Sequence, residues 1–167
     1  MVVPNGVLFG DGISARIKEE LLKEFNLHTI VRLPKGVFSP YTDIPTNLLF
    51  FERFGPTKEI WYYEHPLPEG RKTYTKTQPL QFEEFSSCLD WWKKRKKNEQ
   101  AWTVAAKDVL KYDADGNLLS VNLDIKNPVN QQDIEHLAPE QLIDNIVQKE
   151  QQITALLNDI RNTLMTR

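Results

Sequence analysis

The sequence predicts an α/β fold in which a strand, a helix and a strand are followed by antiparallel strands and then by a helical tail. Three observations predict it. Residues 27–33 and 44–51 are β-branched and aromatic runs of strand length. An amphipathic stretch at residues 13–25 precedes them. From Pro139 onward, apolar residues recur at helical spacing, which predicts a long C-terminal helix.

Composition limits the class of protein. The 167 residues are 40% hydrophobic and 26% charged, which is typical of a soluble globular protein. No apolar run is long enough to cross a bilayer, so no membrane contact is expected. A single cysteine, Cys88, excludes an internal disulfide and favours the cytoplasm. The net charge of -2 gives no general reason to bind nucleic acid, so such binding needs a local patch or a partner chain.

The first elements follow from the apolar pattern. Residues 2–4 and 7–9 predict a buried strand with no preceding turn, so we expect an N-terminal part of a longer polypeptide before it. The helix at 13–25 is expected to bury Ile13, Ile17, Leu21 and Phe25. The order strand, helix, strand favours a right-handed crossover between parallel strands.

The next strands are connected differently. Ten residues separate the strands at 27–33 and 44–51, which is too short for another crossover, so these strands are expected to be antiparallel. Residues 58–64 predict a further strand at an edge of the sheet. The loop at 34–43 contains prolines and a glycine, and its Phe38 and Tyr41 have no obvious core to fill. We therefore expect this loop to contact another molecule.

The part of the chain after residue 70 is predicted to be more helical. Residues 71–79 are a linker by composition, and residues 81–97 predict a helix that buries Cys88 and has an apolar face of Phe82, Phe85, Leu89 and Trp92. A short helix is expected at 101–111, followed by a hairpin that turns at 113–117; a calcium loop there is much the weaker reading. Three histidines without ligand spacing predict no metal site. The predicted divisions are 1–70, 71–130 and 131–167.

Two stretches allow two readings each. The basic run at 93–97 is either a solvated helix C-terminus or a patch that faces phosphates. In the terminal helix, Ile146, Ile153 and Ile160 recur every seven residues, with Leu156 and Leu157 beside the stripe. The stripe would pack either on the helix near residues 82–92 or on a helix of another protein.

The phrases VVPNGVLF, HTIVRLPKGVFSPYTDIPTNLLFFE, KEIWYYE and NLDIKNP together resemble the C-terminal part of the modification (M) subunit of type I restriction-modification systems. These subunits are adenine-N6 DNA methyltransferases. The resemblance implies the C-terminal half of a Rossmann-like sheet with antiparallel last strands. It also implies S-adenosylmethionine as the cofactor of the full enzyme, and DNA, the specificity (S) subunit, the restriction (R) subunit and the missing N-terminal part of the M subunit as partners.

The resemblance also implies roles for particular residues. In KGVF, Phe38 matches the aromatic residue that stacks on the target adenine after it leaves the duplex, and Tyr41 lies beside it. The alternative is that Phe38 fills the core. Contacts with the DNA backbone are expected from Lys35, Lys93, Lys94 and Arg95. The helix surface formed by Ile146, Ile153, Leu156, Leu157 and Ile160 is expected to pack on the specificity subunit.

The chain also departs from the family pattern. It has no glycine-rich cofactor turn and no Asn-Pro-Pro-aromatic motif; Asn127-Pro128-Val129 lacks the second proline and the aromatic residue. We therefore expect this chain alone to bind no cofactor, to contain no catalytic residue and to be inactive. Two functions follow: a fragment of a DNA adenine methyltransferase, or a non-enzymatic interaction module with a coiled-coil arm.

Overall fold

Five strands form one mixed sheet in the order β1-β3-β2-β4-β5. Their bounds are Val2–Pro4 for β1, Asn26–Arg32 for β2, Thr46–Glu52 for β3, Glu59–Glu64 for β4 and Ala101–Ala105 for β5. This computed structural model describes residues 1–129, 147, 150–151 and 153–154, and residues 1–129 belong to one unit.

The pairing of β2 organises the sheet. It is antiparallel to β3, with Val31 opposite Leu48, and parallel to β4, with Val31 opposite Tyr63. The predicted antiparallel pairing of these two strands is confirmed. Because β1 and β2 are both antiparallel to β3, they run in the same direction with β3 between them.

The prediction that residues 58–64 lie at an edge is wrong. The strand β4 lies between β2 and β5. The predicted helix at 101–111 is also wrong for most of its length. Residues 101–105 form β5, which pairs with β4, and only α4 (Ala106–Val109) is helical there. The segment continues into the hairpin of β6 (Leu110–Tyr112) and β7 (Leu118–Val121), whose predicted turn is confirmed.

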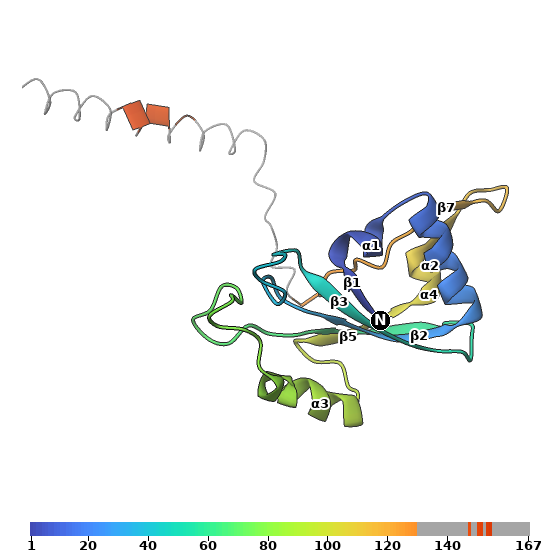
Figure 1. Ribbon diagram of the computed structural model, residues 1–167. Coiled ribbons are helices and arrows are strands. Elements are labelled where there is room, and N and C mark those ends of the chain that lie inside the picture. The colour runs from blue at the N-terminus through green and yellow to red at the C-terminus, as the bar shows by residue number, and fades with distance from the viewer. Residues whose placement is uncertain (130–146, 148–149, 152, 155–167) are drawn as a thin grey trace, which may run out of the picture. The chain divides into compact units, whose positions relative to one another are not determined.

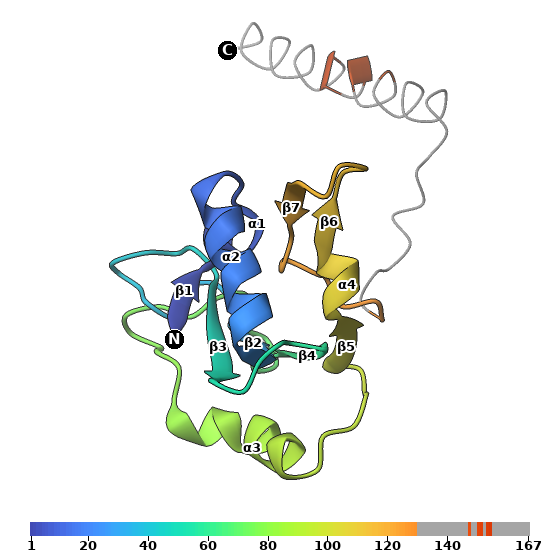
Figure 2. The same ribbon diagram turned by 90° about the vertical axis from the view of Figure 1, so that its right-hand side faces the viewer.

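Helices cover both faces of the sheet (Figures 1 and 2). One face carries α1 (Asn5–Phe9), α2 (Ile13–Glu24), α4 and the β6–β7 hairpin. The other face carries α3 (Ser86–Lys93), which follows the 3₁₀ turn η1 (Phe82–Phe85). Successive residues of β2 and β4 therefore point to opposite cores, as period-2 alternation requires.

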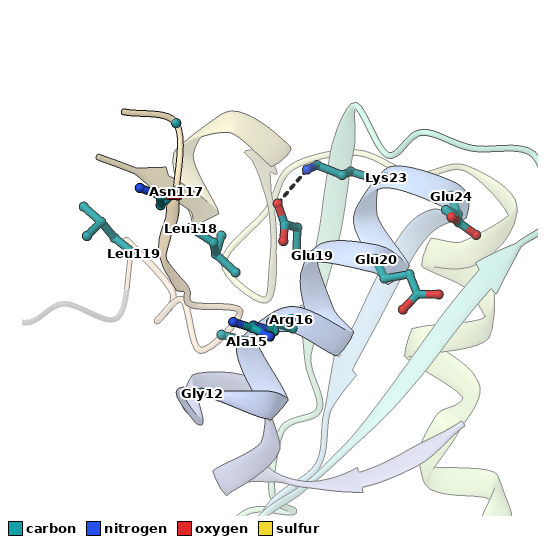
Figure 3. A pocket seen from close by; sticks show the side chains of 11 residues that line it. Gly12, Ala15, Arg16, Glu19, Glu20, Lys23, Glu24, Asn117, Leu118 and Leu119 are labelled. Carbon is teal, nitrogen blue, oxygen red and sulfur yellow. Dashed lines mark hydrogen bonds and ion pairs between the residues drawn. The ribbon is translucent and has the colours of Figure 1, made fainter. Parts of the chain in front are cut away.

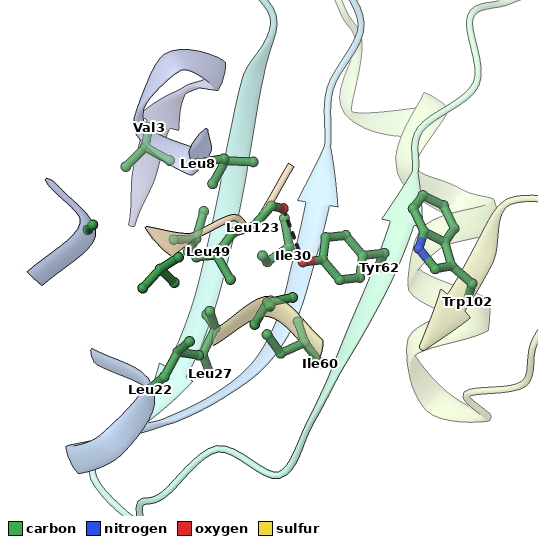
Figure 4. Packing of buried hydrophobic residues seen from close by; sticks show 13 residues of the cluster. Val3, Leu8, Leu22, Leu27, Ile30, Leu49, Ile60, Tyr62, Trp102 and Leu123 are labelled. Carbon is green, nitrogen blue, oxygen red and sulfur yellow. Dashed lines mark hydrogen bonds between the residues drawn. The ribbon is translucent and has the colours of Figure 1, made fainter. Parts of the chain in front are cut away.

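The core under α2 contains Leu22, Leu27, Ile30, Leu49 and Leu123, as Figure 4 shows. Tyr62 lies in the same core, stacks on Trp102 with 5.3 Å between ring centroids, and donates its hydroxyl hydrogen to the Leu123 carbonyl at 3.0 Å. The segment after β7 is thereby fixed to the sheet.

The core over α3 contains Val31, Leu33, Tyr63, Cys88 and Trp91. Cys88 is a buried helix residue, as predicted, and its burial raises the pKa of the thiol to about 11. The predicted apolar face of this helix is only partly correct, since Phe82 and Leu89 are exposed.

Two further expectations are wrong. Residues 7–9 form part of α1 rather than a strand, because pairing ends at Pro4 and the Gly10 N–H closes a helical turn on the Gly6 carbonyl. In α2 the helix itself is confirmed, but Ile13 and Ile17 are exposed while Ala15, Lys18 and Leu22 are buried.

Lys18 explains which face α2 buries. Its side chain is 4% exposed, and its ammonium group donates to the carbonyls of Leu8 (2.9 Å), Gly10 (2.8 Å) and Val121 (2.5 Å). Burial lowers its pKa from the usual value, and the nearby Asp11 carboxylate partly offsets this effect. One cation therefore joins α1, α2 and β7.

Replacing Lys18 with methionine should lower the free energy of unfolding by on the order of 3 kcal/mol, because buried carbonyls lose their donor. Urea denaturation would measure the loss. Lys23→Met is the matched control, since Lys23 is exposed and contacts Glu19; equal stability of the two variants would contradict this account of Lys18.

His65, directly after β4, is 3% exposed and stacks on Phe85 with 4.7 Å between ring centroids. Burial lowers the pKa of its imidazole, and Glu84 only partly opposes this. As the pH falls, the imidazole of His65 is therefore protonated in the unfolded chain before it is protonated in the folded chain. The free energy of unfolding should consequently fall as the pH drops below about 6.5. In His65→Phe, which preserves the stacking shape, denaturation across this range should show a shallower slope; an unchanged slope would refute the assignment.

Candidate functional site: a polar cavity at the carboxyl ends of parallel strands

The carboxyl ends of β1, β2 and β4 meet at one edge of the sheet, because these three strands run in the same direction. A cavity of about 560 Å³ opens there. Its walls include Asn5 directly after β1, Arg32 and Leu33 at the end of β2, and Glu64 and His65 at the end of β4. Ligands of open α/β sheets bind at such an edge.

Hydrogen bonds fix one wall of the cavity. Asn47 Nδ2 donates to Asn5 Oδ1 at 3.1 Å, and Asn5 Nδ2 donates to Asp124 Oδ2 at 3.3 Å. The guanidinium of Arg32 binds the other Asp124 oxygen and the Ile125 carbonyl. Because each member is held by another, these polar groups are oriented before any ligand arrives.

The rim carries positive charge and one buried imidazole. Lys35 and Lys72, which are exposed, line the cavity together with Glu64 and the buried His65. Neither ring nitrogen of His65 has a hydrogen-bond partner within the described residues. Two lysines beside a polar wall suit a ligand that accepts hydrogen bonds and carries negative charge.

The loop at 34–43 leaves from this edge. Pro34, Lys35 and Pro45 line the cavity, but Phe38 and Tyr41 do not. Phe38 is 42% exposed and Tyr41 92% exposed. The loop is closed by hydrogen bonds from the amides of Tyr41 and Thr42 to the Phe38 carbonyl, at 2.9 and 3.2 Å. Phe38 is therefore not sealed in the core, and the loop that carries both aromatic residues begins at the cavity with Pro34 and Lys35.

The structure separates the candidate DNA-backbone residues. Lys35 follows the carboxyl end of β2, whereas Arg95 packs on Trp92, 4.4 Å above its ring, and approaches His28 near the amino end of β2. A strand of this length spans about 20 Å. Lys93 is paired with Asp90 at 3.0 Å. Lys35 and the run around Lys94 are thus two surfaces rather than one patch.

Of the candidate partner-binding residues, only Ile153 lies within the described part of the chain. It is helical and exposed. The others, Ile146, Leu156, Leu157 and Ile160, lie outside the described residues.

Another hollow, of about 730 Å³, lies between α2 and the β6–β7 hairpin (Figure 3). Two of its charged groups bind each other: Glu19 accepts from Lys23 at 2.6 Å, and it also accepts from the Tyr112 hydroxyl at 2.8 Å. This hollow is a groove between packed elements, and it presents no reactive group.

The residues present do not fit a cofactor cradle. Gly10 and Gly12 follow a helix rather than a strand, and the Gly10 carbonyl is occupied by the Lys18 ammonium. Asn127, in the stretch that lacks the second proline and the aromatic residue of the family motif, is buried and donates to the Glu99 carbonyl at 2.6 Å. Among the described residues, no group of acidic, histidine or cysteine side chains is arranged to hold a metal ion. The same residues contain no helix long and apolar enough to cross a membrane.

Several residues that line the cavity were not predicted from the sequence. Asn5, Arg32, Asn47 and His65 come from four separate elements, and only the sheet order brings them together. The available signal was positional, because Arg32 lies near the end of one predicted strand and His65 directly follows another. Taken together with parallel pairing, that position marks the ligand edge.

Comparison with known proteins agrees with this geometry. Residues 1–137 match the family described as N-6 DNA methylase. The chain is 46% identical, over 98% of its length, to the type I restriction enzyme EcoEI methylase subunit of Escherichia coli, and it spans 33% of that protein.

Solved structures show the same relationship. One, described as a modification subunit of a type I restriction enzyme from Vibrio vulnificus, is 63% identical with a TM-score of 0.78, over 81% of this chain and 28% of that one. A chain from a study of type I R-M complex assembly is 38% identical with a TM-score of 0.67, over 100% and 35%. The chain spans about a third of these relatives. It belongs to the N-6 DNA methylase family.

Proposed function

We propose that this chain is part of the DNA-methylating subunit of a type I restriction-modification system. The whole subunit would transfer a methyl group to adenine N6 in DNA. The observation that carries the proposal is the polar cavity at the carboxyl ends of β1, β2 and β4, beside a loop with exposed aromatic side chains. Family membership supplies the reaction class.

In this proposal the chain forms one side of the substrate pocket. S-adenosylmethionine would supply the methyl group and would be held by the rest of the subunit, since these residues offer no cradle for it. Phe38, with Tyr41 beside it, would contact the adenine outside the duplex. An aromatic face is worth about 1–3 kcal/mol per base and so offsets part of the unstacking cost.

The remaining surfaces suit contacts with DNA and other chains. Lys35 lies at the cavity and would contact the strand that carries the target adenine, while Lys93, Lys94 and Arg95 would contact phosphates elsewhere. Within residues 1–129, β1 pairs on one side only, so the preceding part of the subunit would continue the sheet there. The terminal helix would bind the specificity subunit, and the assembled complex would include the restriction subunit in the cytoplasm.

One observation favours the alternative of an interaction module. An apolar groove of about 330 Å³ lies beside α3, lined by Phe50, Phe82, Leu89 and Trp92 among others. Exposed aromatic grooves mark protein contacts. In a methylase subunit the groove would be an internal or subunit contact; in a module it would be the principal functional surface. Methyl transfer by the longer subunit distinguishes the two.

Phe38→Ala in the longer subunit should reduce methyl transfer to DNA about tenfold or more, because the extrahelical base loses its stacking surface. Incorporation of labelled methyl groups would measure this, and thermal denaturation should show little change. Phe54→Ala, an equally drastic change at an exposed phenylalanine, is the control. A loss of several kcal/mol in stability would instead mark Phe38 as a core residue.

Ile153→Asp should abolish binding to the specificity subunit, because a carboxylate would be buried in an apolar helix interface. Co-purification of the two subunits would show the loss. Thr154→Asp, at the neighbouring exposed position, should leave the complex intact. Unaltered complex formation by Ile153→Asp would exclude this surface.

A further inference from the structure

Residues 71–75 pack against the loop that carries Phe38 and Tyr41, and we call them the strap. The Thr73 hydroxyl donates to the Lys35 carbonyl at 3.0 Å, and the Tyr74 amide donates to the same oxygen at 3.1 Å. The strap also borders the cavity through Lys72. Two donors from one short segment therefore hold the start of the loop.

Gly36 shows how closely the strap approaches. Its φ is +79°, and a Cβ there would lie 2.0 Å from the Tyr74 carbonyl oxygen and 2.6 Å from Thr73 Oγ1. The nearest obstacle is a backbone oxygen, which cannot rotate away as a flexible side chain does. Only glycine permits this contact.

Tyr74 anchors the strap at its other side. Its side chain is 1% exposed, and its hydroxyl donates to the Glu84 carboxylate at 2.5 Å. The hydrogen bond from Tyr74 is the main reason why the pKa of Glu84 is lowered. The Glu84 carboxylate is therefore ionised at neutral pH, and the hydrogen bond is charge-assisted. Glu84 also accepts from the Gln81 amide at 3.2 Å and lies 3.8 Å from Arg71.

The anchor is continuous with the core. Glu84 belongs to η1, which leads directly into α3. The side chains of Cys88 and Trp91 in α3 pack on the sheet. A line of direct contacts therefore runs from the sheet through α3, Glu84 and Tyr74 to Gly36, two residues before Phe38.

We infer that the strap holds the 34–43 loop in its observed position, so that Gly36 and Tyr74 are positioning residues for the group that Phe38 and Tyr41 contact. The mechanical coupling is a property of this chain alone. Its consequence for methylation rests on the proposed function.

Hydrogen exchange measured by mass spectrometry on this chain tests the coupling. Tyr74→Phe removes only the hydroxyl that binds Glu84, and it should raise the exchange of the loop amides about tenfold. Gly36→Ala should raise it further. The amides of β2 and β3 should be unaffected in Tyr74→Phe. Gly116→Ala is the matched control, because Gly116 also has a positive φ, +83°, but no atom within 4 Å of an added Cβ.

Unchanged loop exchange in Tyr74→Phe would overturn the inference, as would an equal increase throughout the sheet. If Gly36→Ala does not fold, Tyr74→Phe and Glu84→Gln, which weaken the same hydrogen bond from its two ends, decide the question.

A double-mutant cycle in the longer subunit tests the functional consequence. Tyr74→Phe should lower the kcat of methyl transfer when Phe38 is present and have no further effect in Phe38→Ala. Additive losses would overturn the positioning role. No loss in Phe38→Ala itself would contradict the proposed function while leaving the exchange result in place, so the two failures are distinguishable.

Discussion

The constraint on which this structure depends is that β2 is buried on both faces and paired along both edges. Ile30 points into the core under α2, and Val31 into the core over α3. Pairing with β3 and β4 fixes the strand laterally. A strand held in this way cannot slip by one residue without exchanging its two apolar faces. Its carboxyl end is therefore a rigid point from which a binding loop can extend.

This rigidity gives the candidate site its character. One wall of the cavity is fixed by hydrogen bonds that join Asn5, Arg32 and Asp124, so its polar groups are oriented in advance. In the loop that begins there, Phe38 and Tyr41 expose aromatic surface that folding alone does not explain. In our inference the strap restrains this loop, because it connects the loop to η1 and α3 through Tyr74 and Glu84. In the proposed function, this polar wall and the braced aromatic loop would hold a planar base while another part of the enzyme acts on it.

Sequence reasoning succeeded where a local pattern determined the structure. The strands at 27–33 and 44–51 were predicted because β-branched runs around a short proline loop allow little else. Sequence patterns did not predict features that depend on contacts between residues far apart in the chain. The buried face of α2 depends on carbonyls near residues 8, 10 and 121 that receive Lys18, and β4 became central only because residues 101–105 form a strand. Phe38 stood out in the sequence, whereas Tyr74 and Gly36 did not, because their contact joins segments far apart in the chain.

The central proposal is that this chain supplies one part of a methylase whose cofactor-binding residues lie on another stretch of polypeptide. Reconstitution from two pieces tests it most directly. This chain would be mixed with the separately produced preceding part of a type I methylase subunit and a specificity subunit, and methyl transfer from labelled S-adenosylmethionine to duplex DNA would be measured. The account predicts activity when all components are present and none when either part of the methylase subunit is omitted. Methyl transfer by this chain without the preceding part, or an assembled complex that remains inactive, would contradict it.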